Sequence, residues 1–307
     1  KELAEATERA GNVCHSIFTG HSATSQRLYK KPSLNIAKNL SKFSYFKNRD
    51  LSFFIASAET PIEPIFEKTK SIGYVNLYPD SDGVVRRIQP ISICYEDPYG
   101  KNKIYPLYPS FGLQVACDYL GIKKENVKIV PGKFIDLGKI RIPLDEDQWM
   151  LINYRISSFH HIPFSMVLKR EIPADYFKGR IVLIGGTAAG LFDFVATPIN
   201  PSMPGVDVHA NIIYSIIKNE FITPIKENTI FFVCFILGVI IGLCLLYLSL
   251  LKGLIITSIL IIAYLITGLF LFELKGIYLE MVRPLLTMIG VQLFIFSAKA
   301  LILSIKK

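Results

Sequence analysis

Three long apolar segments follow one another in the last quarter of the chain, and they constrain the fold more than any other feature. They run over about 229–248, 254–272 and 284–305. The hydrocarbon core of a bilayer needs about 20 apolar residues in helical form, and each segment is close to that length. We therefore expect a membrane region over residues 226–307, with three transmembrane helices and the lipid bilayer as its partner.

The basic residues that flank these segments predict which way the chain crosses the membrane. The positive-inside rule counts Lys and Arg in short loops. Lys252 and the lysines at the C-terminus lie on one side, whereas Lys275 and Arg283 lie on the other. The count is close, and the C-terminal lysine cluster decides it in favour of a cytoplasmic C-terminus. Three spans then place residues 1–228 outside the cytoplasm, in a multi-pass protein of the inner (plasma) membrane.

The residues before the membrane region form a second part, over 1–225, of ordinary globular composition in which strands and helices alternate. The pattern predicts helices over 3–9, 61–70, 109–120, 165–169 and 207–218. It predicts strands over 12–18, 73–77, 84–94, 149–154 and 181–184, and a loop with one short helix over 20–50. The turn Asp80–Gly83 suits an antiparallel hairpin between 73–77 and 84–94. The fold class is therefore an α/β domain with a mostly parallel sheet and one antiparallel hairpin.

A glycine-rich turn follows the apolar run Ile181–Ile184, which is typical of a strand buried on both faces. The turn reads GGTAAG, and its first and last glycines fit both common phosphate-binding motifs. The dinucleotide motif needs a third glycine where Thr187 stands, and the P-loop needs Lys and Ser or Thr where Leu191 and Phe192 stand. Both motifs fail at the positions that contact phosphate, which favours a tight strand-to-helix turn over anion binding.

Polar residues beyond this turn are the candidate ligand-binding residues. They are Thr187, Asp193, Thr197, His209 and Asn211. The strand end, the proline-rich loop 196–206 and the next helix would form a crevice at the carboxyl end of the sheet, where α/β proteins bind ligands. The alternative is a purely local role, in which Asp193 caps a turn, His209 bonds to a backbone carbonyl and Asn211 holds the loop. We favour this alternative, since functional sites are rarer than such contacts.

Other kinds of site have little support in the sequence. The adjacent His160 and His161 point to different sides, and the five cysteines show no CxxC spacing, so no metal site is expected. Which cysteines pair, if any, is left open. No ordered Ser-His-Asp or Cys-His set suggests catalysis. The net charge of +9 is not gathered in a basic run with aromatic residues, so nucleic acid is not an expected partner. We expect no catalytic residue, metal or cofactor in this chain.

Several stretches of the chain resemble one known family, the CHASE domain of type 2 (cyclase- and histidine-kinase-associated sensory extracellular domain). They cover most of residues 1–225 in the order of the family. The stretches are LAEATERAGNV (3–13), GYVNLYPDSDGVVRRIQPI (73–91), LYPSFGLQVACDYLG (107–121), MLINYR (150–155) and FKGRIVLIGGTAAGLFDFVATPINPSMPGVDVHANIIYSII (177–217). The three apolar segments that follow are also similar to the usual ending of the family.

The resemblance implies an extracytoplasmic input module of a bacterial receptor. In the family the third helix leads into a cytoplasmic output domain, most often a class III adenylate cyclase, although histidine kinases, diguanylate cyclases and Ser/Thr kinases also occur. The family domain begins with a membrane helix and a strand–helix unit before the LAEA element. We therefore expect this chain to be truncated at both ends. The resemblance transfers no ligand-binding residues.

These observations lead to one preferred hypothesis and two alternatives. The preferred one is a sensor for an unknown extracytoplasmic ligand, which controls an output enzyme outside this chain. Cyclase and kinase outputs act as dimers, so the resemblance also implies a homodimer. The first alternative is a membrane-anchored binding protein without an output enzyme. The second is an extracytoplasmic enzyme with its site at the Gly185–Gly190 crevice, and the lack of a nucleophile–base pair argues against it.

Overall fold

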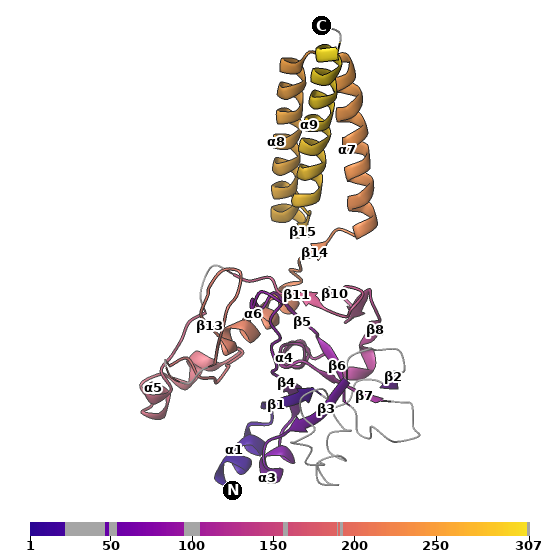
Figure 1. Cartoon of the computed structure of the whole chain (residues 1–307). Helices are drawn as coiled ribbons and strands as arrows, with labels where there is room; N and C mark the ends of the chain where they lie inside the picture. The colour runs from indigo at the N-terminus through magenta and orange to yellow at the C-terminus, as the bar shows by residue number, and fades with distance from the viewer. Residues whose placement is uncertain are drawn as a thin grey trace. The chain divides into compact units, whose positions relative to one another are not determined.

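The computed structural model describes residues 1–21, 47–48, 54–94, 105–155, 159–188, 190 and 193–305. The chain divides into two compact units, Lys1–Phe221 and Ile222–Lys307 (Figure 1). The loop expected over 20–50 lies for the most part outside the described residues.

A six-stranded sheet forms one part of the first unit. Its strands lie in the order β2-β7-β6-β3-β1-β4. Their bounds are β1 Cys14–His21, β2 Lys47–Asn48, β3 Phe54–Glu59, β4 Ser71–Tyr74, β6 Ile91–Cys94 and β7 Tyr105–Pro109. Only the pairs β1–β4 and β3–β6 are parallel in this sheet.

Smaller antiparallel sheets complete the strands of this unit. The three-stranded sheet comprises β8 Lys128–Val130, β9 Phe134–Asp136 and β10 Arg141–Pro143. Two further pairs join β5 Arg87–Ile88 to β11 Met150–Leu151, and β12 Phe194–Val195 to β13 Met203–Pro204. The described strands are therefore mostly antiparallel, and the expected mostly parallel sheet is wrong. Tight turns such as those at Gly132 (φ 66°) and Gly138 (φ 91°) join neighbouring strands, and such short connections permit only antiparallel pairing.

The helices of the first unit begin and end close to the predicted residues. They are α1 Glu2–Ala10, α3 Glu63–Phe66, α4 Phe111–Leu120, α5 Phe164–Leu168 and α6 Gly205–Lys218, with 3₁₀ turns at Lys124–Asn126 and Ala174–Phe177. The hydroxyl of Ser110 caps α4 by accepting a hydrogen bond from the Leu113 N–H (3.3 Å). Gly121 ends α4 with φ 67°, as its position predicts. The helix expected over 61–70 is shorter, because the N–H of Lys70 donates to the carbonyl of Val13 (3.1 Å) instead of to a carbonyl of the helix.

Several predictions on strands in this unit are wrong. The turn at Asp80–Gly83 forms, with φ 83° at Gly83, but β4 pairs with β1 instead of returning as a hairpin. The strand expected over 84–94 is divided into β5 and β6 on either side of Pro90, which has no N–H to donate to a ladder. The strand expected over 149–154 is limited to β11.

The run Ile181–Ile184 is not a strand and is not buried. The side chain of Val182 is 52% exposed and that of Ile184 is 82% exposed. Among the described strands none pairs with this run, and an apolar sequence forms a strand only where a neighbour accepts its backbone hydrogen bonds.

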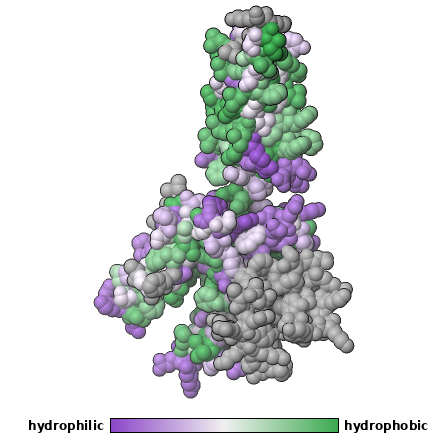
Figure 2. Space-filling view, in the orientation of Figure 1, coloured by the Kyte–Doolittle hydropathy of each residue, from purple (hydrophilic) through white to green (hydrophobic). Residues whose placement is uncertain are grey.

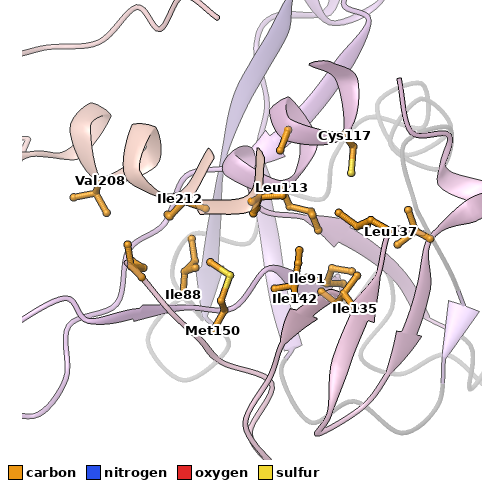
Figure 3. Packing of buried hydrophobic residues seen from close by; sticks show 14 of the residues in the cluster. Ile88, Ile91, Leu113, Cys117, Ile135, Leu137, Ile142, Met150, Val208 and Ile212 are labelled. Atoms are coloured by element: carbon orange, nitrogen blue, oxygen red, sulfur yellow. The ribbon is translucent and has the colours of Figure 1, made fainter. Parts of the chain in front are cut away.

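The core of the first unit lies between the two long helices and the small sheets. Leu113 of α4 and Ile212 of α6 are fully buried, and both belong to one cluster with the apolar side chains of β5, β9, β10 and β11 (Figure 3). The helices approach so closely that a Cβ on Gly112 would lie 2.4 Å from Cγ2 of Ile212. A displacement of α4 is therefore passed directly to α6, since a close-packed interior transmits strain.

The second unit consists of three long helices and one short strand pair. The helices are α7 Glu227–Tyr247, α8 Leu250–Lys275 and α9 Val282–Ile305, and all three are long and apolar enough to cross a membrane, as predicted. Hydrophobic side chains cover most of the visible outer surface of this helical bundle (Figure 2). Gly238 and Gly242 of α7 face Val291 of α9, which lets these two helices lie close together.

Candidate functional site

Thr197, one of the candidate ligand-binding residues, is buried and bonded within its own turn. Its hydroxyl donates to the carbonyl of Asn200 (2.9 Å) and accepts from the N–H of Asn200 (3.1 Å). Both hydrogen-bonding functions of the hydroxyl are thus used by the loop that leads to α6.

His209 lies one turn into α6 and is also buried. Its Nε2 lies 3.1 Å from the carbonyl oxygen of Val75, so this nitrogen carries the proton and donates it. The ring lies edge-on to that of Phe111, with 5.7 Å between the ring centroids. Burial lowers the pKa of His209 to about 4, which keeps the imidazole neutral near pH 7. The other nitrogen, Nδ1, is buried and has no hydrogen-bond partner among the described residues.

Asn211 points to a different side of α6 and joins two segments of the chain. Its Oδ1 accepts from the N–H of Arg155 (2.9 Å), and its Nδ2 donates to the carbonyl of Asp207 (2.8 Å). Asn211 therefore holds the segment after β11 against α6. The amide of Asn211 and the ring of His209 point to different sides of the helix, because residues two positions apart are separated by about 200° around the axis.

Asp193 and the glycine turn lie against the start of α6. The Asp193 carbonyl accepts from the N–H of Gly205 (2.9 Å), and a Cβ on Gly205 would lie 2.5 Å from Oδ1 of Asp193. Gly185 is equally constrained, because its Cβ would lie 2.6 Å from Cβ of Val206. Thr187 is exposed. Close packing against α6 accounts for Gly185 without a phosphate, and a ligand-binding role for the five residues stays a prediction.

One contact in this region was not expected from the sequence. His161 Nε2 lies 2.8 Å from Oδ1 of Asp207, a residue in the first turn of α6. The sequence predicts only that the rings of the adjacent histidines diverge. An Asp in a first helical turn could have suggested a partner, but not which one, since the two residues are 46 positions apart.

A second group of polar residues lies at the C-terminal end of α4, and it was not predicted from the sequence. The hydroxyl of Ser71 donates a short hydrogen bond to Oδ2 of Asp118. The thiol of Cys14 lies beside them, and burial raises its pKa to about 12, against a smaller opposing effect of the neighbouring Ser71 hydroxyl. A cleft of about 360 Å³ borders this group, and we call it the α4 cleft. It is lined by Lys70, Ser71, Gln114, Asp118, Ile122 and Lys123, among others.

The charged residues of the turn before β5 are paired with one another. Arg86 binds Asp82 (2.6 Å) and Asp80 (3.2 Å), and Arg87 binds Asp80 (2.7 Å) while lying over the ring of Trp149. These groups hold the turn together. In the part of the chain that the structure describes, no group of three His, Cys, Asp or Glu residues is placed to hold a metal ion.

The second unit has a band of polar contacts at one end of its helices, which we call the collar. It comprises strand β14 (Thr223–Pro224), strand β15 (Ile277–Tyr278) and the residues Glu227, Glu280 and Arg283. The N–H of Thr223 donates to the carbonyl of Gly276 (2.8 Å). Arg283 donates to Glu280 (2.7 Å) and to Glu227 (3.0 Å), and it lowers the pKa of Glu280.

The collar joins the end of the first unit to the start of α9. Phe221 packs against the core of the first unit, and Thr223 already belongs to the collar, so only Ile222 separates them. At the other end of the bundle, Lys299 of α9 donates to the carbonyl of Leu248 (3.0 Å) at the end of α7. A cation at a helix C-terminus satisfies carbonyls that have no partner within the helix.

The comparisons with known proteins give one match. A family model described as the CHASE2 domain matches residues 1–247, which is more than half of the chain and includes α7. Neither the search of curated proteins nor that of solved structures finds a match.

Proposed function

We propose, from the premise that the chain belongs to the CHASE2 domain family, that it is the sensory and membrane part of a receptor that controls a cytoplasmic output enzyme. A CHASE2 sensory domain followed by three membrane-spanning helices is the arrangement of a transmembrane sensor. In this proposal a stimulus outside the cytoplasm alters the sensory domain, and α9 carries the change across the membrane.

The collar is the observation that best supports this proposal. The chain leaves the sensory domain through β14, and β14 is hydrogen-bonded to β15, only a few residues before α9 begins. A movement at the end of α6 therefore reaches α9 through backbone hydrogen bonds, without first passing along α7 and α8. Two sites are coupled energetically when both shift the equilibrium of the same structural element.

The basic residues support a topology in which residues 1–228 lie outside the cytoplasm. Lys252 lies in the connection after α7, and Lys299 is bonded to the last carbonyls of α7, so both belong to the end of the bundle opposite the collar. By the positive-inside rule this end is cytoplasmic, in the inner membrane of a bacterium.

Cysteine labelling tests this topology. A membrane-impermeant maleimide should label Lys139→Cys, on an exposed turn of the sensory domain, in intact cells. It should label Ser249→Cys, between α7 and α8, only after lysis. The parent chain is the control for its native cysteines. The reverse pattern would overturn the proposed orientation.

We propose that the output domain is a class III adenylate cyclase acting as a homodimer. This rests on the family resemblance, and a histidine kinase, a diguanylate cyclase or a Ser/Thr kinase would fit the same membrane part. The coding sequence after Lys307 decides among them. A stop codon there would instead favour the alternative of a membrane-anchored binding protein.

The role of the collar can be tested in the full-length protein. With a cyclase output, Arg283→Gln should change cyclic AMP formation by about fivefold or more, since coupling free energies are about 1–3 kcal/mol. Lys275→Gln is the matched control, because it removes the same charge nearby and Lys275 has no ion pair among the described residues. Equal activity in both variants and the parent would exclude the collar from signalling.

A further inference from the structure

The α4 cleft has the size of a small-molecule site and a partly buried polar wall. Its volume of about 360 Å³ lies within the usual range for ligand pockets, roughly 300–1,000 Å³. Ser71 and Gln114 are more than nine-tenths buried on its wall, and Asp118 is half-buried. Cys117 and Ile122 also line the cleft, and apolar residues usually surround the few polar groups that orient a ligand.

The charges of the α4 cleft are not satisfied by one another. Oδ2 of Asp118 accepts the hydrogen bond from Ser71, while Oδ1 has no bond to any described residue. Within the described chain the ammonium groups of Lys70 and Lys123 form no ion pair, although both border the same cleft as Asp118. Residues of both charge signs thus line one cleft, and no ion pair joins them among the described residues.

The arrangement of these charges restricts the kind of ligand. Asp118 lies in the last turn of α4, where the negative end of the helix also favours a cation. The neighbouring thiol of Cys14 stays neutral because of its raised pKa, so Asp118 is the negative group at this end. Lys70 and Lys123 border the same cleft and supply two positive charges near this carboxylate. A ligand with one ammonium group and two acidic groups complements this pattern.

We infer that the α4 cleft binds a small acidic amino acid, with the ammonium group at Asp118 and the carboxylates at Lys70 and Lys123. This inference deepens the proposed function. Binding itself does not depend on the proposed function, and only the consequence of binding rests on it. A ligand that bridges these groups would restrain the end of α4. Because Gly112 of α4 lies directly against Ile212 of α6, that restraint would reach α6 and then the collar.

Binding is tested with four probes on the full chain in detergent at physiological salt. L-glutamate and L-aspartate carry the complete charge pattern, glutarate lacks the ammonium group, and L-glutamine lacks the second carboxylate. At least one acidic amino acid should raise the melting temperature, with a Kd by calorimetry about tenfold below those of glutarate and L-glutamine. The inference is overturned if neither acidic amino acid binds, or if glutarate binds equally well.

Variants locate the site. Asp118→Asn keeps an acceptor for Ser71 but should abolish the preference for glutamate over glutarate. Lys123→Gln should raise the Kd for L-glutamate about fivefold. This effect is small because the lysine is exposed. Lys139→Gln, on an exposed turn that does not line the cleft, is the control and should bind as the parent does. An unchanged preference in Asp118→Asn would exclude this cleft. Binding is measured without an output enzyme. The ligand-binding test can therefore give a negative result while cysteine labelling still gives the pattern expected for the proposed sensor.

Discussion

The polar residues around the start of α6 and those around the end of α4 differ in what their side chains bond to. At α6, the side chains of Thr197, His209 and Asn211 are buried and bonded to backbone groups of the same unit. At the α4 cleft, Oδ1 of Asp118 and the ammonium groups of two lysines have no hydrogen-bond or ion-pair partner among the described residues. The first group stabilises the fold, whereas the second retains charge that a ligand can use.

This difference predicts opposite responses to substitution. Removing a buried side chain that bonds to the backbone leaves a backbone group unsatisfied and costs stability. Removing a charge at an open cleft leaves the fold intact and changes only what binds there. Four changes test this contrast, from the most to the least destabilising.

Asn211→Ala should have the largest effect on stability. It removes the acceptor for the N–H of Arg155 and the donor to Asp207, in a position that is almost fully buried. We expect a loss of about 3 kcal/mol in the free energy of unfolding, measured by denaturant titration of the chain in detergent. A loss below about 0.5 kcal/mol, as for a typical surface substitution, would show that Asn211 is not part of the structural framework.

His209 should make the first unit sensitive to mild acid. The folded pKa is about 4 and the unfolded value is 6.5, so below pH 6.5 the unfolded state takes up a proton that the folded state refuses. Stability attributable to this residue is therefore complete above pH 6.5 and decreases as the pH falls toward 4. The loss between pH 7 and pH 5 should be about 2 kcal/mol.

The measurement is the pH dependence of unfolding in the parent and in His209→Gln, which cannot be protonated in this range. The parent should lose stability more steeply than the variant between pH 6.5 and pH 4. Parallel curves for the two proteins would mean that another group causes the acid sensitivity.

Gly185→Ala should destabilise the first unit by about 1–2 kcal/mol, because the added Cβ would lie 2.6 Å from that of Val206. Gly83→Ala is not a suitable control, since φ there is positive, and Ala188→Ser, in the same exposed turn, is better. If both variants have the melting temperature of the parent, the turn adapts to the added Cβ, and close packing does not explain why residue 185 is a glycine.

Features that depend on neighbouring residues in the sequence were predicted, and features that depend on distant segments were not. The three spans depend on composition alone, and the ends of α1 and α4 depend on Gly11 and Gly121, so all were predicted. Strand pairing depends on segments distant in the sequence. The parallel sheet, the hairpin and the buried strand Ile181–Ile184 were therefore wrong, because an apolar run does not show whether a neighbouring strand exists.

The candidate residues around α6 were chosen because polar side chains gather there in the sequence. The α4 cleft has no such signal, since Ser71 and Asp118 are 47 positions apart and Cys14 is more distant still. Only the packing of β1 and β4 beside α4 brings these three residues together.

Asp118→Asn should have the smallest effect on stability. The amide oxygen can still accept from Ser71, and the lost charge faces the cleft, where it has no cationic partner among the described residues. We expect a change of less than about 0.5 kcal/mol in the free energy of unfolding without ligand. The preference for L-glutamate over glutarate should disappear in the same sample. A large loss of stability would place Asp118 with the structural residues of α6 and would remove the contrast between the two groups.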